Sequence, residues 1–440
     1  MDKSNKKRND KQTNLSEFAL LNDRLNLTLS FSKRYQMSTA ICYLRIILPK
    51  ELTNNEESQI ETFIINTVFT RLKGSIRDVD TVIKINRTDF LISIIDINEE
   101  DCSLICERII SYISHIYTIG SNHFTISSNV GICMFPYGSE QLQELQTISK
   151  IQMYEALNVG INQFSIYKGT FDDTAYRKVL IENELPYAIK KGQLYVKYQP
   201  QFHLNKEKVT GCESLIRWNH PRLGEVPPIE FLPHLETIGI LNNIFFFVFE
   251  EVCKNIANEP DLDIKYSINL SVNQLLLKNL IPNLRKAIKK HSVSATNISL
   301  EVTEDIQIYT IKEVKEKLHS LKKIGFTIAL DDFGNGYFSF SDFIELPLDF
   351  VKLDRDFVLS LVKNKKYEGI VSPIIAMIHN LGLEVIVEGI ENHNQFLNWL
   401  KLDCDIIQGY FISKPKLFSE LLNSIEELEV RVNSFIEDKK

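Results

Sequence analysis

Hydrophobic and polar positions follow one rhythm in the first part of the chain and another in the second. From about Phe18 to Lys168, strand-like stretches mix with segments of helical periodicity, a pattern typical of a compact α/β domain. The strands predicted there are "STAICYLRIIL", two within "DTVIKINRTDFLISII" on either side of the polar turn 86–89, and "HFTISSNVGICMFP". We therefore predict a disordered basic tail at 1–16, a smaller α/β domain at 17–170 and a joining helix at 171–190.

From Leu194 onward, short β-rich runs alternate regularly with longer helical segments. This alternation favours βα units around a parallel sheet. The predicted strands are "YVKYQPQF", "VTGCESLIRW", "IKYSINLS", "ISLEVTE", "FTIALDD", "DFVKLD", "LEVIVEG" and "CDIIQGY". Eight βα units in roughly 250 residues predict a (β/α)8 TIM-like barrel. We place this domain at 181–432.

Each predicted barrel strand carries polar residues near its end. In chain order these residues are Gln199; Glu213 and Arg217; Asn269; Glu301; Asp331 and Asp332; Lys352 and Asp354; Glu388; and Gln408. The C-terminal ends of barrel strands meet on one face, where the active sites of this fold lie. Carboxylates gathered in one pocket repel one another, and bound divalent cations would relieve the repulsion. Since every candidate ligand is an oxygen donor, the set favours Mg²⁺ or Mn²⁺ over zinc.

Single residues in this set also have simpler interpretations. Asp331 and Asp332 stand in "IALDDFGNGYFSF", where an exposed turn alone would favour Asp and Gly. Asn269 could cap a helix, and Lys352 could be an ordinary surface lysine. The repetition over all eight strand ends favours metal ligation by Asp331 and Asp332.

Composition narrows the classes of protein and partner. The 440 residues are 44% hydrophobic and 24% charged, an ordinary globular composition. A formal charge of −7 argues against DNA binding through the phosphate backbone, so local cations must hold any anionic ligand. Among seven scattered cysteines, Cys102 and Cys106 alone cannot complete a zinc site, which favours reduced thiols and a cytoplasmic location. The start of the chain is polar and its most apolar run, 238–253, is short, so we expect a buried helix there, no secretory signal and no membrane span.

The second part of the chain, from about Ile181 to Glu429, resembles the EAL domain, a cyclic-di-GMP phosphodiesterase. The name-giving motif reads "ESLIR", with Ser214 in place of the usual Ala. Further matches are "YQP", "NLS", "EVTE", "DDFGNGY", "VKLD", "VEGIEN" and "QGYFISKP". The resemblance implies a barrel with one reversed strand that hydrolyses cyclic-di-GMP to linear pGpG with two Mg²⁺ or Mn²⁺ ions, and a homodimer formed through this domain.

The resemblance also assigns roles to residues. One metal is held by Glu213, Asn269, Glu301 and Asp331, and the second by Asp331 and Asp332. Lys352 matches the lysine beside the attacking water, and Glu388 a carboxylate that acts as base or supports a ligand. The substrate-binding positions are Gln199, Arg217, Asp354, Glu391 and Gln408, while Glu304 matches the residue that positions the loop after Asp332.

These roles agree with the chemistry predicted from the residues, because two metal ions can activate a water and stabilise the leaving oxygen of a phosphodiester. Lys352 can stabilise charge or orient the hydroxide, and the sequence does not decide which group takes the proton. Ser214 should point away from the site, since neighbouring strand residues face opposite sides. Phe338 and Phe340 stand in the loop after Asp332, where the family usually has smaller side chains. In the family this loop couples dimerisation to metal binding, so the difference should affect regulation more than catalysis.

The first part of the chain resembles the GGDEF domain, the diguanylate cyclase module, in a degenerate form. Its signature reads Asn86-Arg87-Thr88-Asp89-Phe90, and "MYEALNVGINQFSIY" matches the last helix and strand. Side chains replace the glycines that let the backbone approach the nucleotide, and the first-strand metal carboxylate is missing from "CYLRIIL". We therefore expect no cyclase activity. Arg77 and Asp80 keep the spacing of the family's inhibitory product site, although such pairs are common on surfaces.

Three functions remain in competition at this stage. The first is an active phosphodiesterase. The second is a catalytically weak cyclic-di-GMP receptor that signals through a regulatory protein partner. The third is an interaction scaffold without nucleotide binding, which Arg217 and Gln408 argue against. Because every metal-ligand position of the family is filled, the sequence favours catalysis.

Overall fold

The computed structural model describes residues 22–49, 59–119, 122–237, 239–303, 311–334, 340–356 and 368–437. It divides into two compact units, the first formed by Met1–Pro186 with Pro233–Ile238 and the second by Tyr187–Leu232 with Gly239–Lys440. The predicted tail, Glu304 and Phe338 lie outside the described residues, as does the side chain of Phe340.

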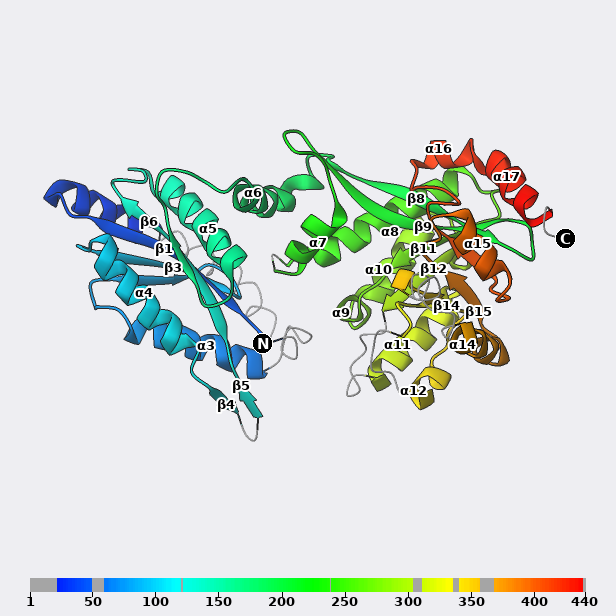
Figure 1. Cartoon of the computed structure of the whole chain (residues 1–440), viewed down its shortest axis with the longest axis horizontal. Coiled ribbons are helices and arrows are strands. Elements are labelled where there is room, and N and C mark those ends of the chain that lie inside the picture. The colour runs from blue at the N-terminus through cyan, green and yellow to red at the C-terminus, as the bar shows by residue number, and fades with distance from the viewer. Residues whose placement is uncertain are drawn as a thin grey trace, which may run out of the picture. The chain divides into compact units, whose positions relative to one another are not determined.

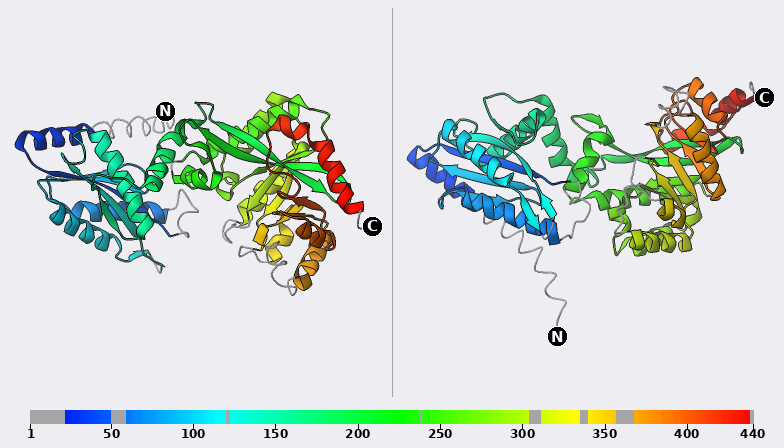
Figure 2. Two further views of the ribbon diagram at one scale, coloured as in Figure 1. Left: turned by 45° about the horizontal axis from the view of Figure 1, so that its top comes forward. Right: turned by 60° about the horizontal axis from the view of Figure 1, so that its bottom comes forward.

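The first unit is built on a five-stranded sheet in the order β2-β3-β1-β6-β7. All neighbouring strands are antiparallel except β6 and β7. The strands are β1 (Thr39–Ile47), β2 (Thr81–Lys84), β3 (Asp89–Ile95), β6 (Ser127–Phe135) and β7 (Phe164–Ile166). The helices are one over 22–35, α3 (Gln59–Gly74), α4 (Glu99–Ile113), α5 (Leu142–Val159) and α6 (Asp173–Ala188). Figures 1 and 2 show α3 and α4 on one face of the sheet and α5 on the other.

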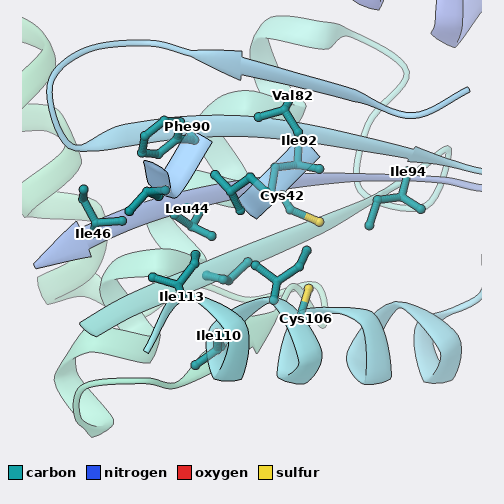
Figure 3. Packing of buried hydrophobic residues seen from close by; sticks show 14 of the residues in the cluster. Cys42, Leu44, Ile46, Val82, Phe90, Ile92, Ile94, Cys106, Ile110 and Ile113 are labelled. Atoms are coloured by element: carbon teal, nitrogen blue, oxygen red, sulfur yellow. The ribbon is translucent and has the colours of Figure 1, made fainter. Parts of the chain in front are cut away.

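Two hydrophobic cores lie on the two faces of this sheet, and strand β1 contributes to both. Cys42 and Leu44 pack against α3 and α4, whereas Ile41 and Tyr43 pack against α5 and α6. This is the alternation expected of a central strand that is covered on both sides. Figure 3 shows the first core between the sheet and α4.

The second unit is a closed barrel of eight strands, extended by one short strand. The sheet runs β10-β9-β11-β12-β13-β14-β15-β16-β8, and the pairing of β8 with β9 closes it. The strands are β8 (Leu194–His203), β9 (Lys208–His220), β10 (Gly224–Val226), β11 (Lys265–Asn269), β12 (Ile298–Thr303), β13 (Thr327–Asp331), β14 (Phe350–Leu353), β15 (Glu384–Val387) and β16 (Ile406–Gln408). Strand β8 is antiparallel to both β9 and β16, and the other neighbours in the closed barrel are parallel. The predicted barrel and its reversed strand are therefore confirmed.

Helices cover the outside of the barrel, as Figure 1 and both views of Figure 2 show. In chain order, the helices after β10 are α7 (Pro228–Thr237), α8 (Leu241–Asn258), α9 (Val272–Leu275), α10 (Leu280–His291), the 3-10 turn η1 (Ala295–Asn297), α11 (Ile311–Ile324), α12 (Phe340–Glu345), α14 (Glu368–Asn380), α15 (His393–Leu400), α16 (Phe418–Leu422) and α17 (Ile425–Glu437). The second half of α7 belongs to the first unit. The apolar run 238–253 falls largely in α8, whose inner face is buried. In the described part of the chain, no helix combines the length and apolar character needed to cross a membrane.

Short strands were missed from the sequence. The predicted strand "HFTISSNVGICMFP" is divided into β5 (Asn122–Phe124), which pairs with β4 (Tyr117–Ile119), and β6. Strand β10 pairs with the far end of β9. Strands β4, β5 and β10 have three residues each, and their positions depend on tertiary pairing.

Candidate active site

Lys352 is the centre of a charged cluster inside the barrel. Its side chain is 1% exposed and comes from the fourth parallel strand after β9, namely β14. Its Nζ lies 2.5 Å from Glu388 Oε1, 2.7 Å from Glu301 Oε2, 3.2 Å from Asp331 Oδ1 and 3.9 Å from Glu213 Oε2. Residues from five different barrel strands or the loops that follow them therefore meet at one point, as the sequence predicted.

Glu213 is fixed by amide donors from both sides. Asn269 donates to its Oε1 at 2.9 Å, and Gln408 donates to its Oε2 at 2.6 Å. Gln201 in turn donates to the Gln408 side-chain carbonyl at 2.8 Å, so a buried relay leads from β8 to Glu213. Since each carboxylate oxygen has a donor, the side chain of Glu213 is held in one orientation.

The sequence prediction missed Gln201. A signal was available, because Gln199 and Gln201 are two residues apart on a buried strand and therefore face the same side. Gln199 itself donates to the Ser413 carbonyl at 3.1 Å and accepts from Gln408 at 3.3 Å. Gln408, predicted to contact the dinucleotide, is 4% exposed and forms hydrogen bonds with Gln199, Gln201 and Glu213.

Burial and crowding shift the pKa values of this cluster. Burial raises the pKa of Glu388 to about 7, although Lys352 opposes the shift. The pKa of Glu301 is raised by burial and by its acidic neighbours Glu213, Asp331 and Glu388. Burial disfavours the charge of Lys352, but the surrounding carboxylates outweigh it and hold the lysine pKa well above its usual value. Lys352 therefore stays protonated at physiological pH.

The cluster is short of positive charge. Four carboxylates surround one lysine, which leaves three negative charges in excess if all are ionised. Oxygen Oε1 of Glu301 is buried and accepts no hydrogen bond from the described residues. Such an uncompensated arrangement is costly. An all-oxygen set with excess charge and an unpaired carboxylate oxygen fits hard divalent cations such as Mg²⁺ or Mn²⁺.

Lys352 draws the carboxylates toward itself in this structure. Within the described ranges, no three acidic side chains here offer oxygens that all lie within 4.8 Å of one another. The donor set thus agrees with divalent cations by its chemistry, and its oxygens are arranged around the ammonium group.

The remaining predicted residues lie around this centre with partners of their own. Asp332 follows Asp331 with a positive φ of 57°, and its backbone N–H donates to Asp331 Oδ1 at 3.0 Å. Arg217 donates to the Ile216 carbonyl and lies 3.8 Å from Glu225. Asp354 directly follows β14.

The carboxylate of Glu391 pairs with an arginine rather than with Lys352. It pairs with Arg355 at 2.7 Å, and both side chains are partly exposed. The structure therefore places Glu391 in a peripheral ion pair and shows no contact between it and Lys352.

Close backbone packing explains one glycine of the "QGY" motif. A Cβ at Gly409 would lie 2.2 Å from the carbonyl oxygen of Ile390. Ile390 also donates its N–H to the Gln408 carbonyl at 3.1 Å. Only glycine allows the loop after β15 to approach the end of β16, and this approach fixes the backbone of Gln408.

An apolar cavity of about 290 Å³ lies beside the cluster. Polar groups of Arg217, Asn269 and Glu301 contribute to its wall, and most of its lining is hydrophobic: Leu215, Ile216, Leu232, Leu241, Ile244, Phe245, Val248, Ile268 and Leu270. Ser214 also lines this cavity, together with its strand neighbours Leu215 and Ile216. A flat aromatic group with polar edges fits such a lining.

In the first unit, the polar side chains of the signature turn 86–89 are bonded to other groups of the same unit. Arg45 lies opposite Asp89 in the β1–β3 register and donates to both of its carboxylate oxygens, at 2.7 and 2.8 Å. The Asn86 side chain accepts from the N–H groups of Thr88 and Asp89, and Arg87 pairs with Glu61. Arg45, missed as a candidate, is an isolated charge in the apolar strand "CYLRIIL", which was the available signal.

Arg45 also holds the joining helix. It lies 3.1 Å from Glu182 of α6, which accepts from Tyr154 at 2.6 Å and pairs with Lys150 at 2.6 Å and with His234 at 3.1 Å. Burial alone would raise the pKa of Glu182, but His234, Arg45 and Lys150 outweigh it and hold it well below its usual value. The two carboxylates Asp89 and Glu182 are thus matched by the two cations Arg45 and Lys150.

Arg77 and Asp80 are close, but Asp80 is used by the backbone. Its carboxylate accepts from the N–H groups of Arg77 and Ile95, at 3.0 and 3.1 Å, and is 6% exposed. Both residues line a hollow of about 870 Å³ together with Arg108. Asp80 therefore stabilises a turn, and Arg77 and Arg108 share the wall of the hollow with Asp80 and Asp101.

Comparison with known proteins follows the same division. Residues 182–415 match the EAL domain model, and residues 8–163 match the model of the diguanylate cyclase GGDEF domain. The bifunctional diguanylate cyclase/cyclic di-GMP phosphodiesterase MucR of Pseudomonas aeruginosa is 27% identical over 94% of the chain, and the cyclic di-GMP phosphodiesterase NbdA of the same organism is 26% identical over 80%. The match covers 61% of MucR and 45% of NbdA, so the chain spans only part of these relatives.

Among solved structures, the MucR phosphodiesterase in complex with c-di-GMP is similar to the second unit. It is 31% identical with a TM-score of 0.53, and the match covers 55% of this chain and 99% of that one. The EAL enzyme Bd1971 in its cAMP-bound form has a TM-score of 0.52 at 25% identity, covering 70% of this chain and 84% of that one.

Proposed function

The chain belongs to the EAL domain family, whose model matches more than half of its residues, and on this premise we propose that it hydrolyses cyclic-di-GMP to linear pGpG. The observation that carries the proposal is the meeting of Glu213, Asn269, Glu301, Asp331, Lys352 and Glu388 inside the barrel. Relatives named as phosphodiesterases and a solved structure with c-di-GMP support the substrate.

We assign the positions of two divalent cations to the acidic set. Glu213, Asn269, Glu301 and Asp331 would hold one Mg²⁺ or Mn²⁺, and Asp331 with Asp332 the second. When bound, these ions would supply Lewis-acid charge for the activation of water and for the leaving oxygen. Gln408 and Asn269 keep Glu213 oriented for this role.

The protein's own groups then bind the substrate, stabilise charge and move the proton. Lys352, kept protonated by its neighbours, would stabilise the negative charge that develops on the phosphoryl oxygens. Glu388, whose burial raises its pKa to about 7, would accept a proton near neutral pH. Arg217 would orient the dinucleotide, and the apolar cavity would take one of its bases.

The direct test is incubation of the purified chain with cyclic-di-GMP and Mg²⁺ or Mn²⁺, followed by chromatography for pGpG. Asp263→Asn is a matched control, because this carboxylate is 93% exposed and forms an ion pair with Lys208 on the surface. The control should cleave as the wild type does. Tight binding of cyclic-di-GMP without any pGpG would instead support the alternative, a receptor that signals through a protein partner.

For the first unit we propose that no cyclic-di-GMP is made. Arg45 occupies both oxygens of Asp89, and Asn86 and Arg87 fill the turn with side chains. Incubation with GTP and Mg²⁺ should therefore give no cyclic product, even in a Glu213→Ala variant that cannot remove it. Product in that variant would show that the unit is a cyclase. Binding of the product at the hollow beside Arg77 and Asp80 is a separate proposal, supported by Arg108 in the same wall.

A further inference from the structure

Three cysteines meet in the core of the first unit, away from every group used above. Cys42 comes from β1, while Cys102 and Cys106 are one turn apart on α4. Their sulfur atoms all lie within 4.8 Å of one another, and none of the three residues is more than 1% exposed. Figure 3 shows Cys42 and Cys106 directed into the same layer between the sheet and the helix.

The spacing of the sulfurs matches that of three ligands around one ion. With metal–sulfur bonds of about 2.3 Å, three sulfurs around a single ion lie about 4 Å apart. The distances in the cluster therefore allow ligation with only small side-chain movements. In the part of the chain that the structure describes, no His, Asp or Glu completes the group, so the ligand set is sulfur alone.

The apolar surroundings of the cluster favour an ion whose charge makes the complex neutral. The cluster lies among Leu44, Ile92, Ile94 and Ile109, where an uncompensated charge is costly. Three thiolates leave a net charge of −2 with a monovalent ion, −1 with a divalent ion and zero with a trivalent one. A trivalent, thiophilic ion such as arsenic(III) is thus the ligand whose complex is neutral in this core.

We propose that Cys42, Cys102 and Cys106 form a three-coordinate thiolate site for a trivalent thiophilic ion of the arsenite class. In the binding reaction, three S–H groups and arsenous acid, As(OH)₃, give three As–S bonds and three water molecules. Arsenic stays at +3 throughout, so the reaction needs no oxidant or reductant.

Each of the three thiols must lose its proton to ligate, and in this reaction each proton leaves as part of a water molecule. The thiolate is the form that attacks and ligates. In a cluster that served only as packing, the three thiols would behave as small hydrophobic side chains.

The experiment uses the full chain, reduced and kept free of oxygen, with sodium arsenite. Mass spectrometry should show a mass gain of one arsenic atom less three hydrogen atoms, and X-ray absorption should show three As–S bonds. The melting temperature of the first unit should rise with arsenite, because the ligand binds the folded state. Cys42→Ala should lose this binding, whereas Cys133→Ala, a buried cysteine of β6 outside the cluster, should keep it.

Two results would overturn the proposal. One is the absence of bound arsenic in the wild type even when arsenite is present during refolding, which removes any barrier of access. The other is equal binding by Cys42→Ala, which would show that Cys102 and Cys106 suffice as a dithiol. If Cys42→Ala does not fold, the number of As–S bonds in the wild type still decides, since two bonds would contradict the site.

Discussion

Buried carboxylates are balanced in different ways in the two units. In the first, Asp89 and Glu182 are matched by Arg45 and Lys150, so the buried charges cancel. In the second, Glu213, Glu301, Asp331 and Glu388 share one cation among the described residues, Lys352.

This difference indicates which of the two units requires a bound cation. An internal guanidinium satisfies both oxygens of Asp89 and leaves no reason for a metal to bind there. The barrel keeps a negative excess that its own side chains do not neutralise, which is the condition for holding two divalent ions. The difference in activity that we propose for the two units thus corresponds to a difference in their balance of charge.

The largest effect is expected from removing the acids of the barrel. Asp331→Ala and Glu213→Ala should each abolish turnover of cyclic-di-GMP, because each removes a proposed metal ligand. EDTA should do the same, and Ca²⁺ should inhibit, since it prefers larger and looser coordination than Mg²⁺. Chromatography of pGpG measures turnover in all four cases. Full activity in EDTA would remove the basis for the metal proposal, and Asp263→Asn is again the control.

Removing Lys352, the cation at the centre of the acidic cluster, should have the next largest effect. Lys352→Ala should lower kcat by about 10²–10³ while substrate affinity changes little, because the lysine acts on charge that develops in the transition state. The measurements are kcat, cyclic-di-GMP affinity and melting temperature of one variant. Lys322→Ala, which breaks an ion pair with Asp349, is the control. A variant that is less stable but turns over normally would assign Lys352 to the fold alone.

Removing the cation of the first unit should cost stability and spare catalysis. Arg45→Ala leaves Asp89 buried without its partner, which typically costs about 3–5 kcal/mol of unfolding free energy at neutral pH. Lys33→Ala breaks an exposed pair with Glu140 and should change the free energy by less than about 1 kcal/mol. Denaturant unfolding of each variant measures both values.

The Arg45→Ala substitution should also change how the free energy of unfolding depends on pH. Burial opposes ionisation of Asp89, but Arg45 outweighs it and holds the pKa of Asp89 below its usual value. The resulting stabilisation is present above the unfolded pKa of about 4 and is lost as the pH falls. In Arg45→Ala, Asp89 gains by becoming neutral, so the difference between wild type and variant should shrink as the pH falls through about 4. A difference that is constant with pH would contradict the pairing.

The smallest effect concerns the relay that the sequence did not reveal. Gln201→Leu leaves the Gln408 carbonyl without its donor and so loosens the support of Glu213. Loss of a direct partner of a metal ligand typically changes metal affinity by about 10–100-fold. Gln201 is one hydrogen bond further away, so the Mn²⁺ concentration for half-maximal activity should rise by less than that. An unchanged Mn²⁺ dependence with a lower melting temperature would reduce Gln201 to a structural role.

The sequence predicted the barrel because hydrophobic runs and polar strand ends repeat along it. It also predicted the meeting of Glu213, Asn269, Glu301, Asp331, Lys352 and Glu388, since the fold brings strand ends together. Partners across the fold were harder to predict. Nothing in the local pattern shows that Gln201 reaches Gln408, that Arg45 reaches Glu182, or that Cys42 meets α4, because each depends on how distant elements pack.

Counting bound manganese tests the central claim most directly. Electron paramagnetic resonance of free Mn²⁺ gives the number of ions that the chain removes from solution. The balance of charges predicts two ions per chain, both lost in Asp331→Ala and both kept when Asp89 of the first unit is changed to Asn. A wild-type chain that binds no Mn²⁺, or an Asp331→Ala variant that binds as many ions as the wild type, would contradict the account.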